Sequence, residues 1–292
     1  MTAVATRVYN TLTTVDAVAA HPEWRIFDCR HSLADPAYGE TAYAEAHIPG
    51  ALFMHLDRDL SGQKTGTNGR HPLPEVASIV ARLSACGVDQ EAQVVAYDDH
   101  GGIFASRLWW LLRWLGHDKV AVLDGGLSAW REAGQPVNAV HTSVAVKQFS
   151  VRSDALSGFG RANTGEILSA LHGTDLLVID ARSPDRYAGK NETLDPVGGH
   201  IPGAINRFYA ENLDPNRTPP GRFFKSPDVL KKEFVSLIGD RKPVTVVQQC
   251  GSGVTACHNL LAMEIAGLSG SRLYPGSWSE WCADPARPIA TG

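Results

Sequence analysis

The stretches Val244-Thr245-Val246-Val247 and Cys250-Gly251-Ser252-Gly253-Val254-Thr255 decide the fold of this 292-residue chain. The first, rich in β-branched residues, is typical of a buried strand, and the apolar run at 256–266 predicts a helix. Cys250 therefore stands in a glycine-containing loop at a helix N-terminus. Backbone N–H groups and the positive end of the helix dipole stabilise a negative charge there. We expect Cys250 to be a nucleophilic thiolate rather than a structural core residue.

Several short segments recur once along the chain. IFDCR at 26–30 is matched by VIDAR at 178–182, and HIPGA at 47–51 is repeated at 200–204. GIFA at 102–105 is matched by GVTA at 253–256. The pair Gly125 and Trp130 is matched by the pair Gly276 and Trp281. Four landmarks in the same order at a nearly constant offset indicate a duplicated domain, because the period is too long for a solenoid repeat.

Each half alternates apolar strand patterns with helical ones, which predicts an α/β fold with a mainly parallel sheet flanked by helices. We expect strands at 25–29, 93–97, 119–123, 176–180, 244–248 and 271–274, and helices at 74–85, 104–115, 227–237 and 255–266. The region between the halves is rich in Ser, Gly, Val and Thr, as linkers are. The predicted layout is a first domain at 1–137, a linker at 138–161 and a second domain at 162–292.

The loop and the duplication together resemble the 3-mercaptopyruvate sulfurtransferases, which carry two tandem rhodanese-like domains. Thiosulfate-specific relatives usually have two basic residues after the cysteine, where this chain has Gly251 and Ser252. The resemblance implies transfer of sulfur from 3-mercaptopyruvate through a Cys250 persulfide to a thiol or cyanide, with release of pyruvate. It places Gly251, Gly253, Val254 and Thr255 around the substrate. It implies no cofactor and no metal ion; thioredoxin or a small thiol are candidate acceptors.

Comparing the halves separates features of the fold from features of the chemistry. Arg30 and Arg182 end equivalent strands in both halves, so we assign them to structural ion pairs. At the catalytic loop the halves differ, because the offset of 151 positions puts Asp99 where Cys250 stands. The first half therefore lacks the thiol, and we expect it to be catalytically inactive.

The second half alone carries Arg186 after its first strand. A guanidinium binds a carboxylate through two parallel hydrogen bonds, so Arg186 is the expected anchor for the donor's carboxylate. The resembled family has a second arginine where this chain has Asp195, which leaves the second carboxylate contact unassigned.

The resemblance also implies a relay in which Asp57 and His71, from the first half, act on Ser252. Such an arrangement can polarise a carbonyl or thiol and pass a proton. A histidine at this place occurs in the first half only, which supports a functional His71. Asp59 competes with Asp57 for the acidic position. Cys257, seven residues and two helical turns beyond the nucleophile, is expected to be a core residue.

Composition excludes several classes of partner and leaves some functions open. The net charge of −4 without a basic run argues against nucleic acid or an anionic membrane, and the longest apolar run is too short to span a bilayer. Five scattered cysteines form no zinc or disulfide pattern, which predicts a reduced, cytoplasmic protein. A thiosulfate sulfurtransferase and a non-catalytic binding module remain alternatives. A phosphatase would need arginine at the position of Ala256.

Overall fold

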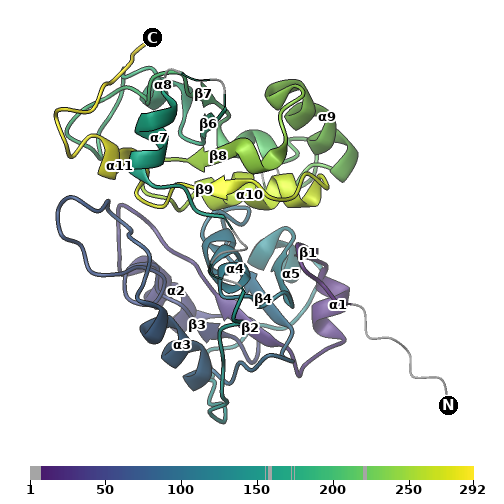
Figure 1. The fold of residues 1–292 in the computed structure, drawn as a ribbon. Helices are drawn as coiled ribbons and strands as arrows, with labels where there is room; N and C mark the ends of the chain where they lie inside the picture. Colours follow the sequence, from purple (N-terminus) through teal and green to yellow (C-terminus); the bar gives the residue numbers. More distant parts are fainter. Residues whose placement is uncertain (1–7, 155, 157–159, 172, 174, 220–221) are drawn as a thin grey trace.

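The computed structural model describes residues 8–154, 156, 160–171, 173, 175–219 and 222–292. The two halves of the chain form two α/β domains, one above the other in Figure 1. The expected fold class is confirmed, since each domain has a parallel sheet with helices on its faces.

The sheet of the first domain has the strand order β1-β5-β4-β2-β3, with every pairing parallel. Its strands are β1 (Leu12–Thr13), β2 (Arg25–Asp28), β3 (Leu52–Phe53), β4 (Val94–Tyr97) and β5 (Val120–Leu123). The central strand, β4, and its neighbour β5 consist entirely of buried residues, as the apolar runs of the sequence predict.

The sheet of the second domain has the order β7-β6-β8-β9, again parallel throughout. Its strands are β6 (Leu177–Asp180), β7 (Ile205–Asn206), β8 (Val246–Gln249) and β9 (Arg272–Leu273). A bridge between Arg161 and Leu273 adds an edge contact that corresponds to the β1–β5 pairing of the first sheet. The two sheets therefore share the same strand order, as expected for duplicated domains. The strand expected at 244–248 begins two residues later, because Pro243–Thr245 forms a 3-10 turn.

The helices follow the strands in both domains (Figure 1). They are α1 (Val15–Ala19), α2 (Tyr38–Glu45), α3 (Val76–Ala85), α4 (Ala105–Trp114), α5 (Gly126–Glu132), α7 (Thr164–Ala170), α8 (Pro184–Tyr187), α9 (Pro227–Ile238), α10 (Ala256–Ile265) and α11 (Ser277–Trp281), with 3-10 turns η1 (Tyr209–Asn212) and η2 (Pro243–Thr245). Helix α9 starts where the sequence predicts, with a Ser226 cap and Pro227 in the first turn. Helix α3 starts two residues later than expected, because Glu75 is still extended.

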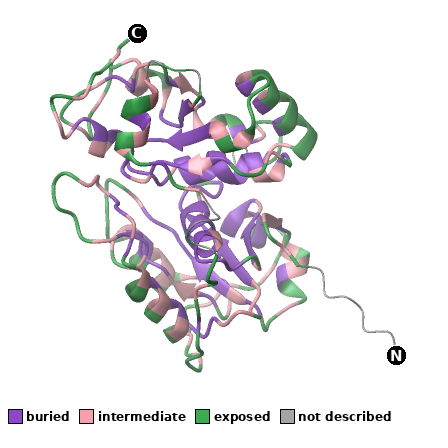
Figure 2. Ribbon diagram, viewed as in Figure 1, coloured by how far each residue is buried: buried purple, intermediate pink, exposed green. Residues whose placement is uncertain are grey.

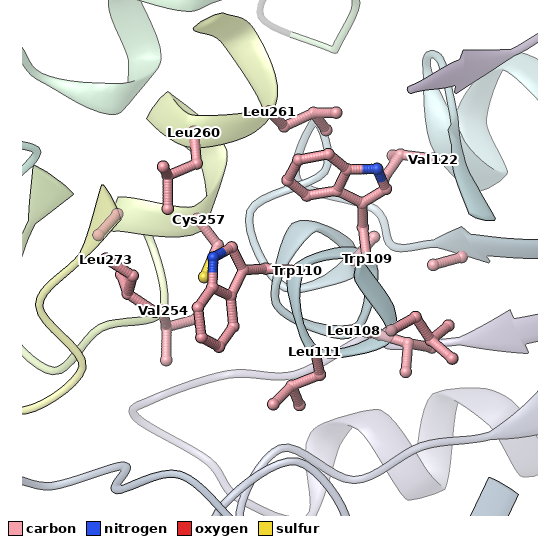
Figure 3. Packing of buried hydrophobic residues seen from close by; sticks show 14 of the residues in the cluster. Leu108, Trp109, Trp110, Leu111, Val122, Val254, Cys257, Leu260, Leu261 and Leu273 are labelled. Atoms are coloured by element: carbon pink, nitrogen blue, oxygen red, sulfur yellow. The ribbon is translucent and has the colours of Figure 1, made fainter. Parts of the chain in front are cut away.

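Helices α4 and α10 pack against each other where the domains meet, and both are almost wholly buried (Figure 2). One hydrophobic core continues across this contact from the first domain into the second. Figure 3 shows the ring of Trp110 beside Val254 and Cys257 of the second domain. The expected core role of Cys257 is confirmed, Trp110 belongs to the same core, and the two domains share it.

The segment after the first domain is not a free tether. Its backbone pairs with the first domain where Asn138 bridges His47 and where Lys147 N–H donates to Ser84 O at 3.0 Å. Phe149 is buried in the shared core. Residues 155 and 157–159 of the expected linker, and 1–7 of the expected first domain, lie outside the described residues. Among the helices that the structure describes, none is long and apolar enough to cross a membrane.

Candidate active site

The loop between β8 and α10 holds the thiol of Cys250 at the domain boundary. Cys250 directly follows the strand, and its side chain is buried. The Gly253 N–H donates to Cys250 Sγ at 3.1 Å. Gly253 has a φ of +78°, and a Cβ there would lie 2.4 Å from Pro275 O, so only glycine allows this turn. The loop thus directs a backbone N–H at the sulfur, as a nucleophilic thiolate needs.

A cavity of about 290 Å³ opens above this sulfur. Both domains line it: Leu33, Arg70, Ile103 and Phe104 from the first, and Ala181, Arg182, Ser183, Arg186, Leu194, Phe208, Tyr209, Cys250, Gly251, Ser252, Val254 and Thr255 from the second. The cavity is lined by four of the expected substrate-binding residues, Arg186, Gly251, Val254 and Thr255. Gly253 does not line it; its backbone N–H donates to the sulfur instead. A site of this size suits a small donor.

His71 reaches this loop from the first domain. Its Nδ1 lies 2.7 Å from Ser252 Oγ, and its Nε2 lies 3.6 Å from Asp57 Oδ1. Burial lowers the pKa of His71 to about 3, and the nearby Arg107 adds to this effect against the opposing charge of Asp57. The imidazole is therefore neutral near pH 7. With its proton on Nε2, toward Asp57, it can accept the Ser252 hydroxyl proton at Nδ1.

The structure distinguishes between the two candidate acids. Asp59 accepts from the His55 backbone N–H at 2.8 Å and pairs with Arg82 at 3.0 Å, so it serves the local fold. Asp57 faces His71 and also pairs with Lys64 at 3.1 Å. Burial raises the pKa of Asp57, but Lys64 and His71 outweigh burial and leave it lowered. Asp57 is thus a charged partner for the imidazole.

His31, His55 and Asp57 are close enough to be considered as metal ligands, with one ligand atom of each within 4.8 Å of the others. The chemistry of His55 does not fit. Its Nδ1 accepts the backbone N–H groups of Asp57 at 3.0 Å and Arg58 at 3.4 Å. A neutral imidazole with its lone pair at Nδ1 carries its proton at Nε2, and that nitrogen then has no lone pair for a metal ion.

Two acidic side chains hold the arginines of the cavity. Glu192 accepts from Arg186 Nε at 3.1 Å and Nη2 at 2.8 Å, and it also pairs with Arg182 at 3.3 Å. Asp195, which stands where the resembled family has its second arginine, pairs with Arg70 of the first domain and lies 3.6 Å from Arg186 Nη2. Position 195, which has no arginine, therefore binds an arginine of the other domain.

Arg107 on α4 is a second link between the domains. Its guanidinium is completely buried and donates to Gly253 O at 3.1 Å, to His71 O at 3.1 Å and to Leu60 O at 3.3 Å. It forms no ion pair with a carboxylate among the described residues. Burial lowers its pKa, and the neighbouring Cys257 and Cys250 oppose this. One side chain thus holds the backbones of both the thiol loop and the histidine segment.

The first domain has a carboxylate where the second has the thiol. Asp98, not Asp99, directly follows β4 and corresponds to Cys250, because the Asp98 and Cys250 carbonyls accept from the equivalent Leu127 and Trp278 N–H groups. The expected match with Asp99 is wrong because the first loop is one residue longer than the second. The buried Asp98 carboxylate accepts four backbone N–H groups of its own loop, from His100, Gly102, Phe104 and Ala105 at 2.8–3.0 Å.

The expected structural ion pairs are confirmed. Arg30 binds Asp28 and Arg182 binds Asp180, each with a shortest distance of 2.6 Å and each buried. Sequence reasoning missed Arg70, Arg107 and Glu192. Arg107 had a signal, since it directly precedes the apolar run at 108–112; Arg70 had only its place beside His71.

Comparison with protein families matches the Rhodanese-like domain twice, at residues 11–133 and 163–284. A probable 3-mercaptopyruvate sulfurtransferase of Pseudomonas aeruginosa is 46% identical over 94% of this chain and 94% of its own length. A putative thiosulfate sulfurtransferase of Mycobacterium tuberculosis is 38% identical over 91% of this chain and 90% of its own. The solved structure of 3-mercaptopyruvate sulfurtransferase from Leishmania major matches with a TM-score of 0.81 at 31% identity, covering 93% of this chain and 74% of that one.

Proposed function

Because the chain belongs to the rhodanese family and is an enzyme of the sulfurtransferase class, we propose that it takes sulfur from 3-mercaptopyruvate through Cys250. The observation that carries this is the meeting of the Cys250 loop with His71 of the other domain, through Ser252. A thiol-bearing 2-oxo acid needs a nucleophile, a proton carrier and a cation for its carboxylate. The site offers a thiol with a backbone N–H on its sulfur, a neutral imidazole 2.7 Å from the adjacent Ser252 hydroxyl, and arginines that line the same cavity.

The first half-reaction forms a new S–S bond. The Cys250 thiolate attacks the sulfur of the donor, and the donor's C–S bond breaks with its electron pair going to carbon. His71 Nδ1 accepts the Ser252 hydroxyl proton, so this pair can take the thiol proton of the donor and deliver it to the enolate that forms. The thiol proton of the donor ends on that carbon, which gives pyruvate and a Cys250 persulfide anion.

The second half-reaction regenerates the thiolate. An acceptor thiol attacks the outer sulfur, the S–S bond breaks, and the acceptor leaves as a persulfide. Cyanide would leave as thiocyanate in the same way. A thiol acceptor such as thioredoxin or a small thiol, and a cytoplasmic location, are parts of this proposal; the scattered cysteines of the sequence support the location.

Thiosulfate is the second candidate donor, favoured by the name of the M. tuberculosis relative. Gly251 and Ser252 give the loop no cationic side chain for a dianion. The arginines above the loop are partly neutralised, because Glu192 holds Arg186 and Asp195 holds Arg70. These contacts support the monoanionic 2-oxo acid as the preferred donor.

Mass spectrometry of the intact protein tests the proposal. After reaction with 3-mercaptopyruvate and no acceptor, the wild type should gain one sulfur atom, and Cys250→Ser should gain none. Cys257→Ser, which alters the other buried thiol of the region, is the matched control and should still gain the sulfur. Full turnover by Cys250→Ser, or a higher kcat/KM for thiosulfate in the wild type, would contradict the proposal.

A further inference from the structure

We propose that Leu33 of the first domain and Leu194 of the second form an apolar docking surface at the mouth of the thiol cavity, and that the sulfur acceptor docked there is a protein with an exposed reactive cysteine. These two side chains are called the leucine pair below. The inference rests on the function proposed above, because it concerns the partner that removes the sulfur from Cys250.

The leucine pair combines exposure with a place in the site. Among the residues that the structure describes, Leu33 and Leu194 are the two most exposed leucines, at 53% and 44%. Both also line the cavity above Cys250. Single exposed apolar residues are common on protein surfaces, but two that come from different domains and line one reactive cavity indicate an interaction site. The pair therefore belongs to the outer rim of the cavity.

Each leucine stands in a bend that a neighbouring polar side chain fixes. Ser32 Oγ accepts the next two backbone N–H groups after Leu33, each at 3.3 Å. Glu192 Oε1 accepts the backbone N–H groups of Leu194 and of the residue after it, at 2.9 and 3.1 Å. Because both bends are already fixed, little backbone has to be ordered when a partner binds.

The exposure of the leucine pair indicates a partner larger than the cavity. Cys250 is buried, and the cavity above it holds about 290 Å³. A small molecule inside this volume would leave the outward surfaces of both leucines in water. A protein that presents a cysteine to the cavity would cover them, and burial of apolar surface stabilises such a complex. Val197, three positions beyond Leu194, is 41% exposed without lining the cavity, so this loop carries apolar surface beyond the mouth.

The chemistry of the transfer balances with such a partner. A persulfide carries its outer sulfur about 2 Å from Cys250 Sγ. The partner's thiolate attacks this outer sulfur and forms a bond to it, while the Cys250 S–S bond breaks with its electron pair returning to Cys250. The partner leaves as a persulfide, and the step consumes no oxidant or reductant.

Discharge of a preformed persulfide tests the proposal separately from donor binding. The protein is loaded with 3-mercaptopyruvate, freed of excess donor and mixed with reduced thioredoxin as the protein probe, with 2-mercaptoethanol or with cyanide. Intact mass follows the loss of one sulfur atom. The second-order rate constant with thioredoxin should fall about tenfold when Leu33→Ser and Leu194→Ser are combined, because two apolar contacts with the partner are lost. The constants for 2-mercaptoethanol and cyanide should change much less.

Further variants separate the apolar contact from other effects. Leu33→Met and Leu194→Met keep an apolar side chain and should retain most of the wild-type rate with thioredoxin. Val235→Ser, at a valine of α9 that is 44% exposed and does not line the cavity, is the matched control and should leave every constant unchanged. Thermal unfolding checks that each variant is folded. The single serine variants, each with a loss of about threefold, replace the combined variant if it does not fold.

An unchanged rate constant with thioredoxin in the combined variant would overturn the proposal. An equal fall with cyanide or 2-mercaptoethanol would also overturn it, since the leucines would then affect the sulfur itself or any acceptor. A wild-type persulfide that cyanide discharges and thioredoxin does not would exclude the protein acceptor. All three results require a persulfide on Cys250, whereas failure of the proposed function would leave the wild type without one.

Discussion

His71 Nδ1 and Ser252 Oγ lie 2.7 Å apart although 181 positions separate them in the chain. The contact joins a first domain, whose corresponding loop has no cysteine, to the loop that carries Cys250. It makes the duplicated half a source of side chains for the reaction rather than a spacer.

Replacing His71 by alanine should lower kcat for 3-mercaptopyruvate by about 10²–10⁴, the usual cost of losing a proton-transfer group. Asp57→Asn should lower kcat less, because the imidazole remains but loses its charged partner. Steady-state rates measure both effects. Asp59→Asn is the matched control, since Asp59 binds Arg82 and the His55 backbone instead. Equal losses in Asp57→Asn and Asp59→Asn would show that neither acid acts through His71.

Adding a methyl group at Gly251 should displace the end of the Arg70 side chain without unfolding the protein. The nearest atoms to the new Cβ belong to flexible guanidiniums rather than to backbone. We expect Gly251→Ala to raise KM for 3-mercaptopyruvate several-fold and to leave the unfolding temperature nearly unchanged. Gly253→Ala should instead lower the unfolding temperature, because its Cβ would lie 2.4 Å from the backbone oxygen of Pro275 and destabilise the loop itself. A wild-type KM in Gly251→Ala would contradict the geometry described for the loop.

Replacing Arg107 should damage stability and activity together. Methionine in its place would leave the buried carbonyls of His71 and Leu60 without this donor, at about 1–3 kcal/mol for each unsatisfied group. Gly253 O would keep only the weak thiol donor of Cys257 at 3.3 Å. Arg107→Lys should be intermediate, because one ammonium group cannot reach all of them. Urea unfolding and kcat, measured at a temperature where each variant is folded, check this. Arg152→Ala, at an exposed arginine that pairs with Asp118 and Asp154, is the control. A kcat equal to wild type in folded Arg107→Met would show that Arg107 is not needed for catalysis.

The stability of the protein should fall as the pH is lowered below the usual histidine range. His258 is fully buried between the domains, with Nε2 3.0 Å from Gly101 O, and burial lowers its pKa to about 4. An unfolded histidine has a pKa of about 6.5, so between these values only the unfolded state takes up the proton. Stability attributable to neutral His258 is therefore complete above pH 6.5 and decreases toward pH 4, by about 2 kcal/mol at pH 5.

Urea unfolding at pH 7, 6 and 5 measures this dependence. His258→Gln, which removes the titrating group and keeps a side-chain amide near Gly101 O, should make the dependence shallower. His141→Gln, at an exposed position, is the control and should leave it unchanged. A pH dependence of the same steepness in His258→Gln and wild type would show that the acid sensitivity arises elsewhere; His71 is then the next group to test.

The sequence was sufficient for the features that depend on local pattern. Apolar runs such as 94–97 and the repeated landmarks identified two α/β domains, because buried parallel strands and their helices have strong signatures. Short edge strands such as Leu52–Phe53 were missed, since two residues carry no periodicity. The helix start at 76 rather than 74 depends on the extended backbone of Glu75, which no composition rule indicates.

The candidate site divides in the same way. Cys250, Ser252 and His71 are recognisable because each stands in a motif. Arg70 is not, because its role depends on a contact with Asp195, 125 positions away, that arises only when the domains dock. The match of Asp99 with Cys250 failed because a constant offset cannot register a one-residue difference in loop length. Spacing in the sequence therefore identifies the motifs, but it does not predict which residues contact them in the folded protein.

The four backbone N–H groups bound by Asp98 keep the loop of the first domain from serving as a second nucleophile site. Replacing Asp98 by cysteine would leave several buried amides without their acceptor. The substitution would therefore lower stability before the loop could hold a thiolate, and a second reactive loop would need more than one changed residue. The first domain contributes His71 to the site instead, so neither half of the chain carries the full set of reacting groups.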